Sequence, residues 1–535
     1  MSYNISSHDD YLSWRTITAK AIESEYVLSS TVLFIAAIVA YWWLAAPEKS
    51  TKTIITNDGY EVPLAPGGIP LLGHALLYRK DPPGFLVRTR TQCGPVFKLN
   101  LAGKKMILVC GAEEQRQLAS LPESVMSLRK AVGAIGFEQT LGYKNVHTGT
   151  QIHKGIVKAI WNSSNSRDGT SPADAMLQTW QTTIRDAMQK EFGVHDDGSH
   201  KFDFFHLVRR VMLRATIEVF VGKAFLRDWT SYNFLTEFMA FQDELEDVTA
   251  KVVVVPRPLA LVAMLWPLQR RRERMQLVMQ ERLEKVLKSK ENGGSDGDRG
   301  FWLREVLAQN IPISDIAEYI VGLLFAGHKN PSIGAAQSYL LLRQHGSEEV
   351  QARCQKESEL LVSSTKPIKW SQFKSLLPTL DRACLESLRV TSHSIGGVRT
   401  AQRELTISVK TEKDAEEIIY RIPKESSVGF AHITSSLDTS IWGEEASVFD
   451  SDLCRYSDEL YSDDYKFTTF SHGVHKCPGR ELAMIHLKIT VALLLTEYDV
   501  KLPDKISPLD FERATLAQRE GPVMVTITQQ QREQK

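Results

Sequence analysis

The stretch FSHGVHKCPG, residues 470–479, runs directly into an apolar segment, Arg480 to Tyr498, whose composition predicts a helix. Within this loop the thiol of Cys477 is framed by an aromatic ring, two glycines and cationic side chains. A metal-bound thiolate needs such surroundings, because backbone N–H groups and a helix N-terminus stabilise its charge and glycines let the chain approach a flat ligand. The alternative is a buried structural cysteine, the usual state of a lone cysteine. The combination favours a metal ligand.

The spacing F-x-x-G-x-x-x-C-x-G, filled here by Phe470, Gly473, Cys477 and Gly479, resembles the haem-thiolate loop of the cytochrome P450 family. The resemblance covers roughly residues 60 to 505. It implies a mainly α fold, with one large helical domain and small β-sheets, and a haem whose iron has Cys477 as its axial ligand. It also implies a monooxygenase that uses dioxygen and electrons from a reductase.

The composition limits the classes of function. The 535 residues are 43% hydrophobic and 24% charged, which allows a sizeable core and argues against global disorder. Lys plus Arg and Asp plus Glu both number 64, so the chain lacks the basic excess typical of nucleic-acid binding. The cysteines are scattered and form no C-x-x-C pair, which favours a reduced, cytosol-facing protein over a disulfide framework or a zinc site. They are Cys93, Cys110, Cys354, Cys384, Cys454 and Cys477.

Residues 26–46, YVLSSTVLFIAAIVAYWWLAA, contain no charged side chain. A helix of this length spans about 30 Å, so the run predicts one N-terminal transmembrane helix. A cleaved signal peptide fits less well, because polar residues 1–25 precede the run, and a buried core helix is the other alternative. Lys49 and Lys52 follow the run and favour a cytosolic body. We therefore expect a single-pass protein of the endoplasmic reticulum membrane, with residues 1–25 as a short lumenal tail.

The rest of the chain divides by composition. Residues 47–73 are rich in Pro and Gly and predict a semi-rigid linker, and residues 74–510 predict the haem-thiolate catalytic domain. Within it, residues 288–300 form a Gly, Ser and charge tract that predicts a mobile surface loop. Residues 511–535 are expected to add a C-terminal β element and a polar tail. The runs 96–101 and 105–110, separated by a Gly-containing turn, predict a β-hairpin.

Glu386 and Arg389 form an E-x-x-R pair about ninety residues before the cysteine loop. Residues at i and i+3 share a helix face, so the two side chains can form an ion pair. Such pairs are frequent on solvated surfaces, and only the position in the chain singles this one out. The resemblance implies a buried structural triad with a later arginine, for which Arg455 is the best match.

The resemblance also implies cations beside the two haem propionates, whose burial requires charge or hydrogen-bond partners. His475 stands two residues before the ligand, and Arg399 stands ten residues after the E-x-x-R arginine. Tyr143 and Lys154 match, in identity and spacing, a pair used for propionates in sterol 14α-demethylases. For each of the four, a solvent-exposed polar side chain is the alternative.

Residues 316–335 predict part of a long helix that begins after Pro312, with Ser314 as its N-cap. The resemblance places this helix over the haem face opposite the cysteine. There the family commonly carries Ala-Gly-x-acid-Thr, whereas this chain has Lys329 in the acid slot and Asn330 in the alcohol slot. Asn330 can form hydrogen bonds and His328 could titrate near neutral pH, so we predict catalytic roles for His328, Lys329 and Asn330. Packing is the alternative for His328.

Residues 252–266, VVVVPRPLALVAMLW, are too short and too interrupted by proline to span a membrane, and arginines follow them. They predict either a substrate-access loop that dips into the membrane interface or a core segment. The chain looks closest to the sterol 14α-demethylase, cholesterol 7α-hydroxylase and prostacyclin synthase branches. This implies an apolar sterol or triterpenoid substrate, in the specialised metabolism of a fungus, and NADPH–cytochrome P450 reductase, with cytochrome b5 as a second partner.

Two further functions stay open at this stage. The missing acid and alcohol in the central helix suggest a haem-thiolate isomerase or dehydratase that acts on an oxygenated lipid without a reductase. The same irregularity is the only support for a non-enzymatic haem-binding membrane sensor. Incorporation of oxygen in step with NADPH consumption distinguishes the monooxygenase from both.

Overall fold

The computed structural model describes residues 55–56, 59–70, 72–162, 171–192, 201–226, 233–252, 255–291, 299–364, 367–410, 417–513 and 515–530. The predicted anchor at 26–46 and the predicted tail at 1–25 lie outside the described residues, as does most of the predicted loop at 288–300. Among the helices that are described, none is long and apolar enough to cross a membrane.

Helices make up most of the described chain. The α-helices are α2 (Ala75–Lys80), α3 (Pro82–Cys93), α4 (Ala112–Ala119), α5 (Leu128–Ala134), α6 (Phe137–Thr140), α7 (Thr150–Asn162), α8 (Pro172–Phe192), α9 (Phe204–Phe220), α10 (Phe234–Val252), α11 (Arg257–Ala260), α12 (Trp266–Glu291), α13 (Phe301–Leu307), α14 (Ile313–His345), α15 (Glu348–Ser363), α16 (Trp370–Leu376), α17 (Pro378–Val390), α18 (His432–Ser436), α19 (Thr439–Trp442), α20 (Asp458–Ser462) and α21 (Arg480–Glu497). Short 3-10 or π turns are η1 (Asn145–Gly149), η2 (Lys223–Leu226), η3 (Leu261–Leu265), η5 (Thr468–Phe470) and η6 (Gly473–His475).

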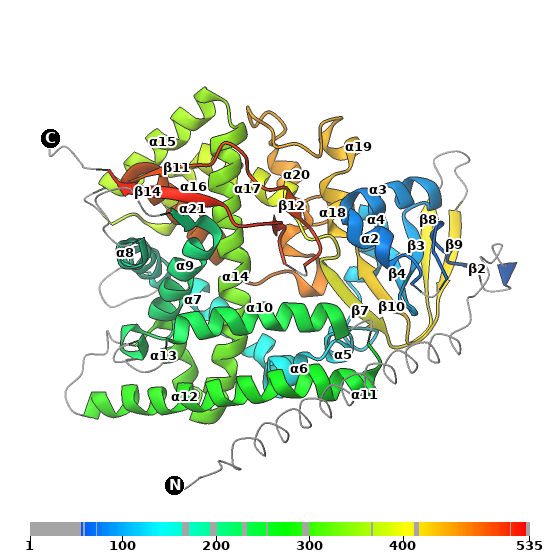
Figure 1. Cartoon of the computed structure of the whole chain (residues 1–535), viewed down its shortest axis with the longest axis horizontal. Coiled ribbons are helices and arrows are strands. Elements are labelled where there is room, and N and C mark those ends of the chain that lie inside the picture. Colours follow the sequence, from blue (N-terminus) through cyan, green and yellow to red (C-terminus); the bar gives the residue numbers. More distant parts are fainter. Residues whose placement is uncertain are drawn as a thin grey trace, which may run out of the picture.

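The strands form small sheets that gather mainly on one side of the helical body (Figure 1). The sheet orders are β1-β2-β9-β8, β3-β4-β10-β7-β5, β11-β14-β6 and β12-β13. The strands are β1 (Ile55–Thr56), β2 (Gly59–Glu61), β3 (Val96–Leu101), β4 (Lys104–Val109), β5 (Met126–Ser127), β6 (Lys201–Asp203), β7 (Gly397–Ala401), β8 (Leu405–Lys410), β9 (Glu417–Ile422), β10 (Ser427–Phe430), β11 (Tyr498–Lys501), β12 (Leu509–Asp510), β13 (Gln518–Arg519) and β14 (Met524–Gln529). The described chain is therefore mainly helical with small sheets, as predicted.

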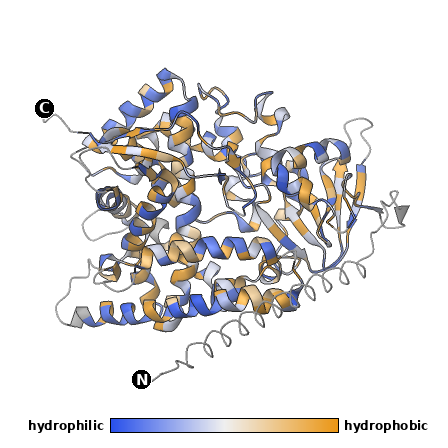
Figure 2. Cartoon of the chain, viewed as in Figure 1, coloured by the Kyte–Doolittle hydropathy of each residue, from blue (hydrophilic) through white to orange (hydrophobic). Residues whose placement is uncertain are grey.

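Helix α14 passes through the middle of the molecule and contacts α9, α12, α17 and α21 (Figure 1). From Pro331 to Leu342 nearly every residue of α14 is buried, because apolar and small side chains occupy all faces of the helix there. Helix α21 is similarly buried along most of its length. Apolar residues concentrate where these helices meet, and polar ones lie on the outer helix faces (Figure 2). The two helices thus form the rigid centre of the large core.

Several local predictions can be compared with this architecture. The predicted hairpin is present: β3 and β4 pair antiparallel with Leu101 opposite Lys104, and Ala102 and Gly103 have positive φ. The prediction of Ser314 as an N-cap is wrong, since α14 begins at Ile313 and Pro312 is its N-cap. Proline fixes φ near the helical value, so the helix starts directly after it, and the Ser314 hydroxyl donates to Asp315 instead. Strand β14, in the predicted C-terminal element, joins a sheet of the main body.

Candidate active site

The cysteine loop connects η5 to α21 and holds Cys477 at the edge of the core. The backbone N–H of Cys477 donates to the carbonyl oxygen of Phe470 at 2.8 Å, which closes the loop, and α21 begins three residues later at Arg480. Burial raises the pKa of the Cys477 thiol, while the backbone N–H of Gly479 and the charges of Arg480 and Lys154 act in the opposite direction. These donors and cations favour a thiolate once a metal replaces the proton.

Gly473 is needed for a reason that differs from the one expected. Its φ is +62°, and a Cβ at this position would lie 2.2 Å from the carbonyl oxygen of Ala119 at the end of α4. The close approach is therefore to the backbone of α4 rather than to a flat ligand. The left-handed conformation and the missing side chain together let the loop fold against α4.

A cavity lies between the cysteine loop, α21 and α14. It is open on one side, and the space between atoms, counted together with the open solvent at its mouth, is about 1120 Å³. No lining residue carries a formal charge among those the structure describes. The walls are mostly apolar, with Cys477 from the loop and Asn330 from α14 among the few polar groups. A flat, largely apolar ligand suits this lining.

Arg399 and His475 lie near each other beside Glu123. Arg399, on β7, is 5% exposed, and within the described part of the chain the only hydrogen bond of its guanidinium goes to the carbonyl oxygen of Val398. Burial lowers the pKa of Arg399 to about 10. Burial, with the charge of Arg399, lowers the pKa of His475 to about 4, and the His475 ring is 3.4 Å from the Glu123 carboxylate. A buried guanidinium with a single carbonyl partner fits an anionic group of a ligand.

The structure separates the other two predicted propionate residues. The ammonium nitrogen of Lys154, on α7, is 3.4 Å from the carbonyl oxygen of Val474, inside the cysteine loop. Lys154 therefore lies beside the site. Tyr143 is 62% exposed, and its ring stacks on that of His147 with 4.0 Å between centroids. It is absent from the lining of the cavity, so the structure does not bring Tyr143 to the site.

The three predicted catalytic residues of α14 point in different directions. Asn330 lines the cavity. The ring of His328 is buried away from it, with Nδ1 3.0 Å from Gln242 and Nε2 2.9 Å from the carbonyl oxygen of Arg209. Burial lowers the pKa of His328 to about 3, so titration near neutral pH, which the sequence suggested, is wrong.

Lys329 also lies outside the cavity lining, because it forms buried ion pairs. Its ammonium nitrogen is 2.8 Å from Asp243 and 2.6 Å from Glu246, both on α10. Burial by itself would raise the pKa of Asp243. The charges of Arg209 and Lys329 outweigh burial and hold this pKa below its usual value. The predicted direct catalytic roles of His328 and Lys329 are therefore not supported by their positions: both residues connect α14 to neighbouring helices.

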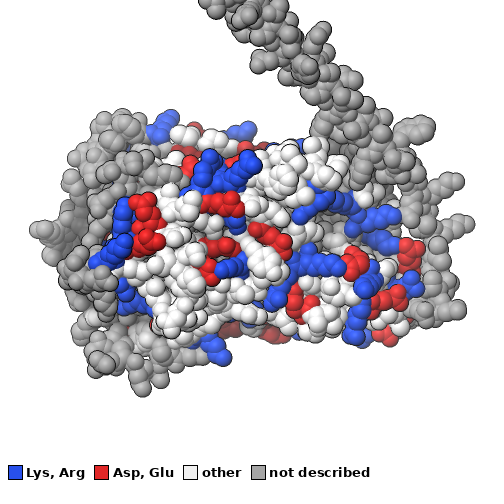
Figure 3. Space-filling model, turned by 90° about the horizontal axis from the view of Figure 1, so that it is seen from below, with Lys and Arg blue, Asp and Glu red and all other residues white. Residues whose placement is uncertain are grey.

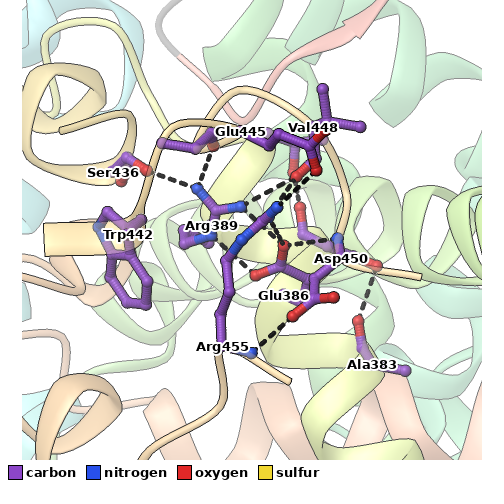
Figure 4. Close-up of polar contacts among 12 residues, drawn as sticks. Ala383, Glu386, Arg389, Ser436, Trp442, Glu445, Val448, Asp450 and Arg455 are labelled. Atoms are coloured by element: carbon purple, nitrogen blue, oxygen red, sulfur yellow. Dashed lines mark hydrogen bonds and ion pairs between the residues drawn. The ribbon is translucent and has the colours of Figure 1, made fainter. Parts of the chain in front are cut away.

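Glu386, Arg389 and Arg455 come together as predicted from the resemblance (Figure 4). Arg389 donates to both carboxylate oxygens of Glu386 at 2.7 Å, and Arg455 lies 3.6 Å from the same carboxylate. Arg389 also donates to the carbonyl oxygens of Ser436, Ala446 and Val448. Glu386 and Arg389 are both buried, and their hydrogen bonds connect α17 to the segment that precedes the cysteine loop. This geometry agrees with the structural role that the resemblance implies.

Four polar residues of the cavity wall were missed by the sequence reasoning. The ring nitrogens of His153 and His486, Nδ1 of His393 and the indole N–H of Trp302 are buried without a hydrogen-bond partner among the described residues. Burial lowers the pKa of His153 and His393 to about 4 and that of His486 to about 3. The sequence offers only their positions as signals: His153 is next to Lys154, His393 follows α17, and His486 lies in α21.

The donor set fits a haem: a thiol for the iron, broad uncharged walls and, outside the cavity lining but beside His475 of the cysteine loop, the buried guanidinium of Arg399 for a carboxylate. The fold and the site together define a mainly helical haem protein with a cysteine ligand. Residues 63–527 match the model of the Cytochrome P450 family, and the chain belongs to that family. It is a cytochrome P450 monooxygenase with a cysteine-ligated haem.

The relatives are distant. The chain is 22% identical to lanosterol 14-alpha demethylase from Bos taurus over 82% of each chain. It is 25% identical to cytochrome P450 7A1 from Oryctolagus cuniculus, over 85% of this chain and 90% of that one. A solved structure described as retinoic acid bound cyanobacterial CYP120A1 superimposes with a TM-score of 0.62 at 20% identity, and covers 88% of this chain and all of that one. This last likeness shows the fold alone.

Proposed function

We propose that the substrate is an apolar sterol or triterpenoid, which the enzyme hydroxylates or oxidises further. The observation that carries this proposal is the uncharged, mostly apolar lining of the cavity between the cysteine loop and α14. Such walls gain free energy by removing a hydrocarbon skeleton from water. The distant likeness to a lanosterol demethylase supports the same class of substrate. A place in fungal specialised metabolism belongs to the proposal as well.

The chain's own residues then have distinct tasks. Cys477 holds the iron, and the haem supplies the dioxygen chemistry when it is bound. Arg399 and His475, with Lys154 close by, hold the acidic edge of the haem and so set its orientation in the cavity. Asn330 contributes a hydrogen-bonding amide to the cavity wall, and the surrounding apolar side chains exclude water.

Members of this family receive electrons from redox partners. For this chain we propose NADPH–cytochrome P450 reductase as the donor, with cytochrome b5 as a second donor. The proposed location is the endoplasmic reticulum membrane, with residues 26–46 as a single-pass anchor and the catalytic domain in the cytosol. The uncharged run at 26–46 and the lysines that follow it support this location.

The described residues of the segment 252–266 are divided between surface and core, and the exposed ones support contact with a membrane. Val262 is 56% exposed and Trp266 is 48% exposed, whereas Ala260 and Leu265 are fully buried. On the lower face of the molecule, charges of both signs alternate beside uncharged surface (Figure 3). We propose that the exposed apolar side chains enter the membrane interface, where a sterol reaches the protein.

The test uses membranes that contain the full chain and the reductase, a panel of sterols and triterpenoids, NADPH and isotopically heavy dioxygen. We expect a product that carries heavy oxygen and forms only with NADPH. The matched control is Cys477→Ser, which should form no product, beside Cys454→Ser, which changes an exposed cysteine and should leave turnover intact. Conversion without NADPH and without the label would instead identify a reductase-independent isomerase. Absence of any product over the panel would reject the sterol proposal.

A further inference from the structure

The side-chain oxygen of Asn330 has a defined partner across the cavity wall. Asn330 Oδ1 accepts a hydrogen bond from the backbone N–H of Leu516 at 3.1 Å. The two ends of an amide are hard to tell apart by shape, and the partner decides between them. A backbone N–H can only donate, so the oxygen of the amide must face Leu516 and the nitrogen must face elsewhere.

The backbone of Leu516 is itself held in place. The next residue, Ala517, donates its N–H to the carbonyl oxygen of Thr391 at 2.9 Å, at the end of α17. The carbonyl oxygen of Ala517 accepts from Nε2 of Gln337, on α14, at 2.8 Å. The C-terminal segment is thus fastened to α17 and α14 within one residue of Leu516. The hydrogen bond to Asn330 therefore comes from a backbone segment that is itself held in place.

The nitrogen of the same amide has no protein partner among the described residues. Asn330 lines the cavity and is half-buried, and within the described residues Oδ1 is its only side-chain atom with a hydrogen-bond partner. The nitrogen is also absent from the buried polar atoms that lack a partner, so part of its surface is exposed, on a side chain that lines the cavity. Asn330 therefore offers N–H donors to a ligand, while its oxygen already accepts from Leu516. From the sequence, either end of the Asn330 amide could have faced a ligand.

The hydroxyl of Thr469, another polar group on this wall, cannot replace it. Thr469 donates its only O–H to the carbonyl oxygen of Leu388 at 3.0 Å. It is left with lone pairs and no proton for a ligand. Near this part of the wall, an acceptor atom of a ligand is matched by Asn330 and not by Thr469.

We propose that Asn330, held by the backbone of Leu516, selects a substrate that carries a hydrogen-bond acceptor oxygen, such as a ketone, ether or epoxide oxygen, close to the reacting carbon. The proposal deepens the proposed function and rests on it, since it narrows the class of apolar substrate. A ligand with no such oxygen leaves a desolvated amide N–H unpaired, which penalises it.

The experiment uses the full-length, haem-loaded protein and two probes of equal shape, the bicyclic ketone norcamphor and its parent hydrocarbon norbornane. Their dissociation constants are measured from the shift of the haem absorption band. Norbornane gives the affinity expected from hydrophobicity alone. After correction for the lower hydrophobicity of norcamphor, we expect its dissociation constant to be about tenfold smaller than that of norbornane. A tenfold change in affinity corresponds to one neutral hydrogen bond. Asn330→Leu, of similar size, should abolish this preference, whereas the control Thr469→Val should keep it.

A second measurement reads the donor without any substrate. The carbonyl complex of the reduced protein has a C–O stretching frequency that a nearby N–H donor lowers. Asn330→Leu should therefore raise this frequency, and Thr469→Val should leave it unchanged.

The outcomes separate the two proposals. An equal preference for norcamphor in wild type and Asn330→Leu, or failure of both probes to bind, would overturn the role of Asn330. An unchanged C–O stretching frequency in Asn330→Leu would do the same. If the probes behave as expected while no sterol or triterpenoid is turned over, the donor role stands and the substrate class proposed above fails.

Discussion

Lys329 of α14 and Glu246 of α10 form a buried ion pair with 2.6 Å between the ammonium nitrogen and Oε2. The two side chains are 2% and 4% exposed. Asp243, one turn earlier on α10, takes a second contact from Lys329 at 2.8 Å and pairs with Arg209 of α9 at 3.0 Å. Lys329, where the resemblance to the family led us to expect an acid, therefore joins three helices next to the cavity, without entering it.

Removal of this lysine should destabilise the protein strongly. Lys329→Met leaves the Glu246 carboxylate buried without its closest cation, and breaking a buried pair in this way costs about 3 to 5 kcal/mol. The free energy of unfolding, measured with urea, checks the value. Lys285→Met is the control, because its partner Glu281 is exposed and such pairs contribute little to stability. Adding Glu246→Gln to Lys329→Met should recover part of the loss, and no recovery would contradict the pairing.

Because His328 is buried in its neutral form, we expect the free energy of unfolding to depend on pH. The pKa of this histidine falls from 6.5 to about 3 on folding, chiefly because it is buried. Below pH 6.5 the unfolded chain takes up a proton that the folded chain does not. The stability that the protein gains by keeping His328 neutral is therefore fully retained above pH 6.5 and is lost progressively as the pH drops toward 3.

The measurement is the free energy of unfolding against pH in wild type and His328→Asn. The variant should show a slope smaller by up to about 1.4 kcal/mol per pH unit in this window. Above pH 6.5 the two slopes should coincide, which serves as an internal control. Identical slopes throughout the acidic range would contradict a buried, neutral His328.

The two arginines of the Glu386 triad should differ in importance. Arg389→Lys loses the two-pronged contact with Glu386 in a fully buried setting, which should cost about 3 to 5 kcal/mol and most of the bound haem. Arg455→Lys changes a side chain that is 19% exposed and 3.6 Å away, and should cost about 1 kcal/mol or less. The ratio of haem to protein after purification, with the urea midpoint, checks both. Equal losses would contradict this ranking.

The substitutions Gly473→Ala and Gly103→Ala form a matched pair. Both have positive φ, +62° and +87°, but an added Cβ meets the backbone of Ala119 at 2.2 Å only at position 473. Gly103→Ala should cost about 1 to 2 kcal/mol of backbone strain. Gly473→Ala should cost more and release haem, because the loop must move away from α4. Haem retention on dilution measures the difference, and equal retention would show that the contact with α4 is unimportant.

The predictions that rested on short stretches of sequence agree with the structure most closely. The hairpin at Gly103 and the pairing of Glu386 with Arg389 depend on residues within a few positions of one another, so local geometry determines them. The cap of α14 was misjudged because Pro312 and Ser314 are both good start signals, and the fixed φ of proline prevailed. Tyr143 was misjudged because spacing alone does not show which face of a segment is covered.

The order of residues by itself determined the cysteine loop, the helix after it and the mainly helical class, because a metal ligand, its glycines and an apolar helix are encoded within thirty residues. Only the tertiary structure decided which side chains reach the cavity. Three consecutive residues, His328, Lys329 and Asn330, point about 100° apart around a helix, so packing against α9 and α10 buries two of them and leaves the third facing the cavity. The direction of the Asn330 amide was decided by Leu516, a residue 186 positions away.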